Sequence, residues 1–359
     1  MTARILVIAD DFTGAAEIAG IGSRFGLAAE IIRRPPYHST AQLLVIDTNS
    51  RPLPPTNAAA RVREALGQIC ASDFDVIFKK IDSVLRGPVL AEIEAAIQAL
   101  NRQSAILAPA NPSRGRTIRD GQYHINGVPL NLTPLGSDPE HPRHSADVRT
   151  LIGEPGARIT IADASELKHV EQLAASLGQD VLPVGAADFF ASILSLAGFV
   201  STKQPSKLAP GRTLMVCGTT NAPSRQAIDR AAKRGVCTVH VPPPMTDLPS
   251  AIAAAMERDG HAIVTSGAIQ SGSARDTAFT NLSTCVAHAI ERLRIDELLI
   301  EGGATSSAIL ERMGWHRFRD CTELAAGVVR MSVIGQSIHI TAKPGSYPWP
   351  DTVWERLRN

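Results

Sequence analysis

Short runs of apolar residues alternate along the chain with longer stretches in which apolar residues recur at helical spacing. Runs that are nearly continuous in Val, Ile and Leu are typical of strands covered on both faces of a sheet. In the first half of the chain, such runs predict strands at 5–10, 43–48, 76–82, 105–111 and 159–164. Helical spacing lies between or after them, at 12–25, 56–70, 87–100 and 165–177. This alternation predicts a largely parallel α/β sheet.

The alternation breaks at residues 201–211, which are polar and contain two prolines and one glycine. Such a composition is typical of a linker. Beyond it, helices separate strands predicted at 213–218, 238–242, 262–267 and 297–303, and the longest of these helices is expected near 274–294. The end of the chain differs, because VVRMSVIG and SIHITAKPG predict an antiparallel pair of strands. We therefore expect two α/β domains with largely parallel sheets, at 1–205 and 212–359.

Length and composition limit the number of domains and the kinds of molecule that the protein is expected to bind. A length of 359 residues exceeds what one hydrophobic core usually serves, which also favours two domains. A net charge of +1 and an aromatic content of 4% argue against binding to nucleic acids or membranes. The five cysteines form no CxxC pair, which favours reduced thiols in the cytoplasm. The first apolar run is too short for a signal peptide or a membrane span.

Polar residues follow each of the first four predicted strands, where open α/β sheets bind ligands. Arginine suits a carboxylate or a phosphate, and carboxylates suit sugar hydroxyls. The candidates are Asp10, Asp11 and Thr13, then Arg51, then Lys80, Asp82, Ser83 and Arg86, and finally Gly115, Arg116 and Thr117. The last group opens the stretch 112–148, which is rich in Pro, Gly, Arg and His and is expected to be irregular and functional.

Structural alternatives exist for these residues. Asp11 or Thr13 is a good N-cap for the first helix, although one cap does not explain two adjacent aspartates. Asp82 or Ser83 would cap a helix over 85–100, with Arg86 in a surface ion pair. The turn SRGRT, at 113–117, would be an exposed basic turn. Four polar strand ends together favour a binding site over these separate explanations.

The second half of the chain has small residues where its strands end. The sequences CGTTN (217–221), TSGAIQSGSA (265–274) and EGGATSS (301–307) each precede a helix. Glycines let backbone amides approach a phosphate, and a helix N-terminus favours an anion. Tight turns with Thr or Ser caps are the alternative. The chain lacks a Gly-Lys dipeptide and therefore a Walker A loop, and the glycines of GIGSRFG (20–26) fall at the end of a predicted helix.

Five segments resemble the four-carbon acid sugar kinase family, of the DUF1537 type: IADDFTGA, KKIDSVLRG, APANPSRGRTIRDGQYHINGVPL, GGATSSAIL and AKPGSYPWPD. The resemblance implies an acid-sugar-binding domain at 1–205, a nucleotide-binding domain at 212–359 and an active-site cleft between them. It also implies transfer of the γ-phosphoryl group of ATP, with Mg²⁺, to the terminal hydroxyl of threonate, erythronate or 3-oxo-tetronate, which gives the 4-phosphate.

The resemblance also implies roles for the residues of this chain that match the family's motifs. Asp11 or Asp10 is expected to orient the attacking hydroxyl, with Asp82 next, and the remaining candidates of the first half bind the sugar acid. The nucleotide loops are expected to comprise Gly218, Thr219, Asn221, Gly302, Gly303, Ala304, Thr305, Lys343 and Gly345, and the Gly/Ser loop adds Ser266. Protein ligands of the metal are not predicted.

Three positions depart from the family pattern. Ala304 stands where an acidic residue is usual, Thr219-Thr220-Asn221 stands in place of serines, and Pro344 replaces the serine of Lys-Ser-Gly. These departures keep a second class open, a sugar-acid sensor of the same fold without catalysis. An NAD-dependent oxidoreductase is the third class, which the absence of GxGxxG after any predicted strand disfavours. The stereochemistry of the acid stays open, as does a homodimer.

Overall fold

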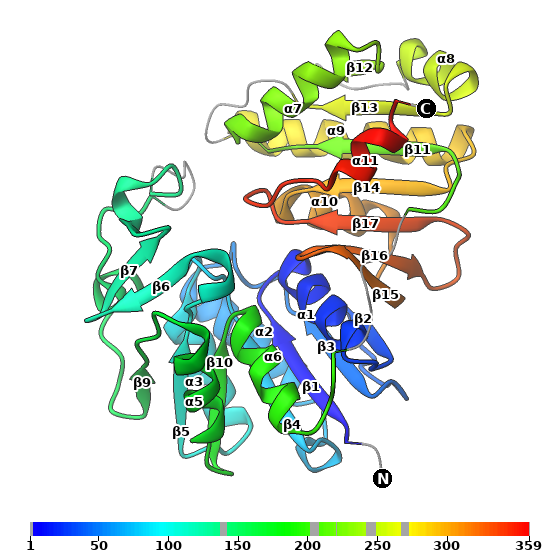
Figure 1. Ribbon diagram of the computed structural model, residues 1–359. Helices are drawn as coiled ribbons and strands as arrows, with labels where there is room; N and C mark the ends of the chain where they lie inside the picture. The colour runs from blue at the N-terminus through cyan, green and yellow to red at the C-terminus, as the bar shows by residue number, and fades with distance from the viewer. Residues whose placement is uncertain are drawn as a thin grey trace. The chain divides into compact units, whose positions relative to one another are not determined.

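The computed structural model describes residues 3–136, 142–201, 208–219, 221–241, 249–266 and 273–358. The chain divides into two compact units, Met1–Lys203 and Gln204–Asn359, which we call the N-terminal and C-terminal units. The division falls inside the predicted linker, of which 202–207 lie outside the described residues. Each unit contains a large sheet with helices, so the predicted α/β class is confirmed (Figure 1). The expected cleft between the domains stays a prediction.

The sheet of the N-terminal unit is entirely parallel. Its strands follow the order β2-β3-β1-β4-β10-β5-β9. Their bounds are β1 (Ile5–Ala9), β2 (Ala29–Ile32), β3 (Leu43–Asp47), β4 (Val76–Lys80), β5 (Ser104–Ala108), β9 (Ile159–Ile161) and β10 (Val181–Gly185). Five of these strands coincide with predicted ones, and β2 and β10 are additional. All residues of β1 and β3 are buried, and all are apolar except Asp47, which pairs with Arg33.

Helices of this unit form two packed groups. Their bounds are α1 (Phe12–Arg24), α2 (Pro55–Leu66), α3 (Val89–Ala99), α4 (Val148–Ile152), α5 (Leu167–Ala175) and α6 (Ala187–Leu196), with 3-10 turns η1 (Ala71–Asp73), η2 (Pro112–Arg114) and η3 (Leu130–Leu132). Helices α1 and α5 both pack on α6, whereas α2 packs on α3. The four predicted helices are therefore present as α1, α2, α3 and α5, and each is shorter than its predicted range.

The stretch 112–148 is more ordered than the sequence indicates. It contains a three-stranded antiparallel sheet of β6 (Arg116–Arg119), β7 (Gln122–Ile125) and β8 (Val128–Pro129), which lies beside the large sheet (Figure 1). Ile118 and Tyr123 are fully buried, and the Ile118 amide donates to the carbonyl of Ala164. We name β6–β8 the flap sheet.

The sheet of the C-terminal unit follows the order β12-β13-β11-β14-β17-β16-β15. Its first five strands are parallel, and β16 and β15 are antiparallel to their neighbours. The bounds are β11 (Thr213–Cys217), β12 (Thr238–His240), β13 (His261–Thr265), β14 (Glu297–Glu301), β15 (Arg317–Ala325), β16 (Val328–Val333) and β17 (His339–Lys343). The antiparallel pair predicted at the end is β16 and β17, and β15 was not predicted.

Helices cover both faces of this second sheet. Their bounds are α7 (Ala222–Lys233), α8 (Ser250–Arg258), α9 (Ser273–Arg292), α10 (Gly303–Met313) and α11 (Asp351–Arg356). Helices α9 and α10 pack together behind the strands, and α11 lies in front (Figure 1). A core that includes Met215, Ile228, Leu299 and Val353 joins α7 and α11 to the strands.

Two adjacent lysines are buried at the end of β4. Successive residues of a strand point to opposite faces, so Lys79 and Lys80 need partners on both sides of the sheet. The ammonium of Lys79 lies 2.6 Å from Glu92 of α3, and that of Lys80 lies 3.3 Å from Glu17 of α1. Helices α1 and α3 therefore lie on opposite faces of the sheet, and each provides one carboxylate.

Glu92→Leu should strongly destabilise the protein, because it leaves the fully buried Lys79 without its counter-charge. We expect the free energy of unfolding to fall by about 3–5 kcal/mol, and Lys79→Met combined with Glu92→Leu to recover most of it. Urea unfolding measures both. The matched control is Glu94→Leu on the exposed side of α3, which should change stability by less than about 0.5 kcal/mol. Equal losses at both glutamates would contradict the pairing.

Candidate active site

The topology of the N-terminal unit identifies where a ligand would bind. From β1 the chain passes through α1 to β2 at one side of the sheet, whereas from β4 it passes through α3 to β5 on the other side. Neighbouring strands whose connections diverge in this way leave a crevice at their carboxyl ends. The topology therefore predicts a ligand site between Asp10 and Asp11 after β1 and Asp82 after β4.

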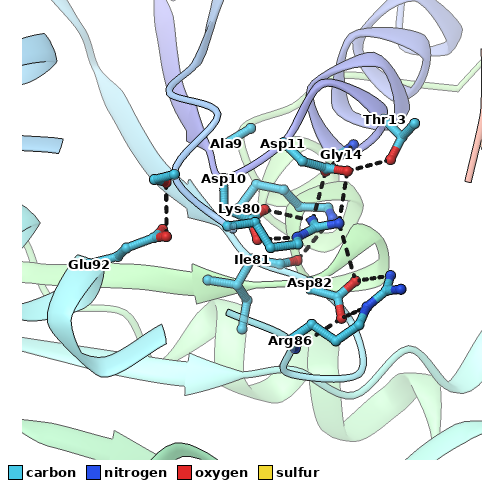
Figure 2. A network of polar contacts seen from close by, with 12 residues as sticks. Ala9, Asp10, Asp11, Thr13, Gly14, Lys80, Ile81, Asp82, Arg86 and Glu92 are labelled. Atoms are coloured by element: carbon cyan, nitrogen blue, oxygen red, sulfur yellow. Dashed lines mark hydrogen bonds and ion pairs between the residues drawn. The ribbon is translucent and has the colours of Figure 1, made fainter. Parts of the chain in front are cut away.

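Arg51 connects the two adjacent aspartates. Its Nε and Nη2 atoms donate to the Asp10 carboxylate at 2.8 and 2.9 Å, and its Nη1 and Nη2 atoms donate to Asp11 at 2.7 Å each. Nη1 also lies 3.7 Å from Asp82 Oδ1. Figure 2 shows Asp10, Asp11 and Asp82 close together in one network of polar contacts. One guanidinium therefore balances carboxylates from two strand ends.

Asp11 is also the N-cap of α1, as the sequence allowed. Its Oδ1 accepts from the Gly14 amide at 2.8 Å, and its Oδ2 accepts from the Thr13 hydroxyl at 2.6 Å. A Cβ at Gly14 would lie 2.8 Å from Asp11 Oδ1, so glycine leaves room for the carboxylate. With the two bonds from Arg51, Asp11 accepts four hydrogen bonds, which is about the capacity of an ionised carboxylate.

The segment after β4 is a loop, and the alternative that Asp82 or Ser83 caps a helix is wrong. Helix α3 begins only at Val89, and Asp82 instead accepts from the backbone amides of Val84 and Arg86 at 3.3 and 3.0 Å. The Arg86 guanidinium binds the same carboxylate with two bonds of 2.9 Å. Leu85 adopts a positive φ of 63°, which is rare for a bulky residue and lets the loop fold back on Asp82.

The electrostatics of this network keep its acids ionised. Burial by itself raises the pKa of Asp10, but Arg51, Lys79 and Lys80 outweigh it and hold the pKa below its ordinary value. Burial likewise opposes ionisation of Asp82, yet Arg86 and Arg51 hold that pKa well below the ordinary value. Both side chains are therefore hydrogen-bond acceptors at neutral pH.

The turn at 113–117 is not simply exposed, because Arg116 is buried and its Nη1 donates to the hydroxyl of Ser83. Gly115 has a φ of 65°, and a Cβ there would overlap Asn126. Thr117 belongs to the opposite face of β6, because neighbouring strand residues alternate. The structure thus brings Ser83 and Arg116 together, and Thr117 is not part of that contact.

Sequence reasoning missed several residues that support the site. Tyr123 of the flap sheet donates its hydroxyl to the carbonyl of Ser83, and burial raises its pKa. Glu17 and Glu92 neutralise the two lysines, and Ser50 donates to Glu92 at 2.8 Å. The available signal was the pair Lys79-Lys80 inside an apolar strand, which requires buried acids on neighbouring helices.

The candidate nucleotide loops of the C-terminal unit follow neighbouring strands. Cys217, Glu301 and Lys343 end β11, β14 and β17 and stand in register across the sheet. The turns that follow therefore lie side by side. A Cβ on Gly218 would overlap the Thr305 hydroxyl, and one on Gly345 would lie 3.1 Å from the Thr219 hydroxyl.

Asn221 donates from Nδ2 to the carbonyl of Gly345 at 2.9 Å, which joins two of these turns directly. Gly302 has a φ of 99° and is the N-cap of α10, so Gly303 and Ala304 occupy the first turn of that helix, and the Ala304 side chain is exposed. The hydroxyl of Ser266, after β13, is buried without a hydrogen-bond partner among the described residues. The other residues of that Gly/Ser loop, 267–272, lie outside the described residues.

Lys343 is placed differently from a direct phosphate ligand. Its side chain is fully buried, its ammonium lies 2.8 Å from Glu301, and it donates to the carbonyl of Pro344 at 3.2 Å. Burial lowers its pKa despite the attraction of Glu301. The Lys343 ammonium therefore binds Glu301 and the backbone of the turn, and it is buried rather than exposed to a phosphate.

A magnesium ion needs few protein atoms. In the described part of the chain, no cluster of three or more His, Cys, Asp or Glu residues could hold a metal. Mg²⁺ commonly retains water and binds substrate phosphates with only one or two protein oxygens, and the hydroxyls of Thr219 and Thr305 could provide them.

The helices that the structure describes include none long and apolar enough to cross a bilayer.

Asp82→Asn should weaken the protein in a pH-dependent way. The folded-state pKa of Asp82 is lowered, so its stabilisation is present above its unfolded pKa of about 3.9 and is lost as pH falls through the folded value. We expect a loss of about 2 kcal/mol at pH 7 that shrinks towards pH 3. Urea unfolding at both pH values measures it, with exposed Asp73→Asn as the control. A difference independent of pH would contradict the assignment.

Comparison with known proteins identifies the family of this chain. The family described as "Sugar-binding N-terminal domain" matches residues 5–188. The D-threonate kinase of Salmonella typhimurium is 33% identical over 268 residues, which are 65% of this chain and 62% of that kinase. The chain therefore spans less than two thirds of the length of that relative.

Two further proteins match nearly the whole chain. The 3-oxo-tetronate kinase of Brucella melitensis is 26% identical over 96% of this chain and 93% of its own length. A solved DUF1537 structure from Haemophilus influenzae has a TM-score of 0.72 at 19% identity and covers 98% of this chain and 99% of its own, which shows the shared fold. The chain therefore belongs to the four-carbon acid sugar kinase family.

Proposed function

We propose that this chain is an ATP-dependent kinase that phosphorylates the terminal hydroxyl of threonate, erythronate or 3-oxo-tetronate to give the 4-phosphate. The observation that carries the proposal is the network of three aspartates and two arginines at the carboxyl ends of β1 and β4, inside the region matched by the sugar-binding family. Relatives named for D-threonate and 3-oxo-tetronate support the class of substrate.

The three aspartates differ in how many hydrogen bonds their carboxylate oxygens already accept. An ionised carboxylate accepts about four hydrogen bonds, and Asp11 already accepts four. Asp10 accepts two, both from Arg51. Asp82 also accepts four, but three of them fall on Oδ2, and its Oδ1 accepts only one, from Arg86. We therefore assign hydroxyl binding to Asp10 and Asp82, and we assign to Asp11 the positioning of Arg51 and α1.

The carboxylate of the sugar acid needs a cation that can reach it. The side chain of Arg86 is 26% exposed, against 14% for Arg51, which is engaged by both aspartates. Arg86 is therefore the proposed ligand of the substrate carboxylate. Arg116 would fix Ser83 beside it.

Phosphoryl transfer requires mainly alignment and neutralisation of charge. Because the pKa values of Asp10 and Asp82 are lowered, these groups are weak bases, and their proposed role is to orient the attacking hydroxyl. The triphosphate would lie on the turns that contain Gly218, Gly302 and Gly345. Mg²⁺ bound to ATP would neutralise the phosphate oxygens.

A sugar-acid-binding protein without catalysis is the second candidate. Ala304 favours it, because its exposed side chain at the start of α10 has no oxygen to offer a metal or phosphate ligand. Calorimetry with ADP separates the two, since a sensor of this kind need not bind nucleotide.

The decisive assay measures ADP release from ATP with D- and L-threonate, D- and L-erythronate and their 3-oxo forms. We expect turnover with at least one acid, because the candidate site combines hydroxyl acceptors with arginines. Glucose is the control substrate, since it has hydroxyls but no carboxylate. Absence of turnover with every acid, from protein that is folded by circular dichroism, would refute the kinase proposal.

Asp10→Asn and Asp82→Asn should each lower kcat/KM for the sugar acid by about 10²–10⁴, because each removes a negative acceptor from the attacking hydroxyl. Asp11→Asn should cost less, since asparagine also caps helices and Asp11 has no acceptor position left for substrate. Steady-state kinetics provide the comparison, and Asp73→Asn serves as the exposed control. Near-normal kcat/KM in both Asp10→Asn and Asp82→Asn would rule out these roles.

A further inference from the structure

The loop between β4 and α3 is held by side chains that come from the stretch 112–148. Tyr123 of β7 donates its hydroxyl to the carbonyl of Ser83, and Arg143 donates from Nη2 to the carbonyl of Leu85 at 2.7 Å. Arg116 of β6 donates to the Ser83 hydroxyl. The donors lie 33 to 58 residues from their acceptors in the sequence, so tertiary folding creates these contacts.

Both carbonyls belong to peptide groups that bind Asp82. The Ser83 carbonyl shares its peptide group with the Val84 amide, and the Leu85 carbonyl shares its own with the Arg86 amide. These two amides donate to Asp82 Oδ2, at 3.3 and 3.0 Å. In a planar trans peptide the carbonyl and the amide point in opposite directions. Each peptide group is therefore held at both ends, by a side chain from 112–148 and by Asp82.

This arrangement determines which oxygen of Asp82 can accept from a ligand. Oδ2 accepts from the two amides and from Arg86 Nε at 2.9 Å, whereas Oδ1 accepts one bond, from Arg86 Nη2 (Figure 2). A carboxylate oxygen has about two acceptor positions, so one remains on Oδ1. A hydrogen bond to a carbonyl also polarises its peptide group and strengthens donation by the amide. Donors at the two carbonyls thus favour occupation of Oδ2.

Tyr123 and Arg143 are anchored outside the loop that they contact. Tyr123 is fully buried, and its backbone amide donates to the carbonyl of Ala146 at 2.7 Å. The backbone amide of Arg143 donates to the carbonyl of Gly136 at 2.7 Å. Because these backbones are fixed by other parts of the chain, the two side chains can impose an orientation on the loop 82–86.

We propose that Tyr123 and Arg143 are positioning residues for Asp82: they orient the two peptide groups that occupy its Oδ2 atom and so keep Oδ1 available for the attacking hydroxyl. The inference rests on the proposed function for the role of Asp82. Both residues act through the loop, and neither is assigned a contact with substrate. Tyr123 stays a neutral donor, because burial raises its pKa, and Arg143 adds a charge-assisted bond.

Tyr123→Phe tests the inference, because it removes the hydroxyl and keeps the ring. We expect kcat with the sugar acid to fall about tenfold, with KM for ATP nearly unchanged. Arg143→Met should have a similar effect, and Arg143→Lys should restore part of kcat, since an ammonium also donates to a carbonyl. Steady-state kinetics on protein that is folded by circular dichroism measure these effects. Wild-type kcat in both Tyr123→Phe and Arg143→Met would overturn the inference.

Thr133→Val is the matched control. Thr133 is also buried within 112–148, and its hydroxyl donates to a main-chain carbonyl, that of Leu130, at 2.7 Å. Because this carbonyl is outside the loop 82–86, the variant should lose stability as Tyr123→Phe does but keep kcat. Equal falls in kcat in Thr133→Val and Tyr123→Phe would show a general loss of packing and would also overturn the inference.

A double-mutant cycle separates action through Asp82 from other effects. In the Asp82→Asn background, Tyr123→Phe should lower kcat/KM by less than about twofold, because the group that it positions is already altered. Losses that multiply in the double variant would show that Tyr123 acts independently of Asp82.

Hydrogen exchange followed by NMR gives a readout that does not depend on activity. The Val84 amide should exchange about tenfold faster in Tyr123→Phe, and the Arg86 amide should do so in Arg143→Met, whereas Thr133→Val should leave both amides as in the wild type. Unchanged exchange at both amides would contradict the inference. Failure of the kinase proposal is recognised separately, as a wild type that releases no ADP with any acid while both amides still respond to the variants.

Discussion

The ion pairs of Arg51 are the interaction on which the N-terminal unit depends. Two adjacent aspartates at the end of a buried strand repel each other and lose hydration, so they stay ionised only beside a cation. Arg51 reaches both from the loop after β3 and approaches Asp82 after β4. Three strand ends are thereby joined by one side chain, and the start of α1 is joined to them through the cap.

The sequence predicted the frame of the fold because its strands are locally encoded. Continuous apolar runs located β1, β3 and β4, and the polar residues after them marked the end of the sheet that forms the site. The partners of those residues could not be predicted from the sequence. Glu17 and Glu92 meet their lysines across the sheet, and no local pattern couples a helix residue to a strand residue. The flap sheet and β15 were missed because their strands alternate polar and apolar residues within polar surroundings.

Two residues, Asp82 and Lys343, are placed differently from their sequence predictions because their charges are buried and need partners. Asp82 follows a strand and precedes a helix, which suggests a cap, yet the positive φ of Leu85 turns the loop so that Asp82 accepts its own loop's amides. Lys343 ends a strand in a family motif, yet the register of β14 and β17 puts it beside Glu301. Lys343 is oriented by a tertiary ion pair, whereas Asp82 is oriented by contacts within its own loop, and in both cases the sequence shows only the residue type.

The charges around Arg51 have a consequence for how a ligand would approach. Five acidic and five basic side chains of this network balance each other, so together they carry no formal net charge: Asp10, Asp11, Asp82, Glu17 and Glu92 with Arg51, Arg86, Arg116, Lys79 and Lys80. An anionic ligand would therefore gain little from long-range attraction. Its recognition would depend on directed contacts at short range, and its association rate would vary only weakly with ionic strength.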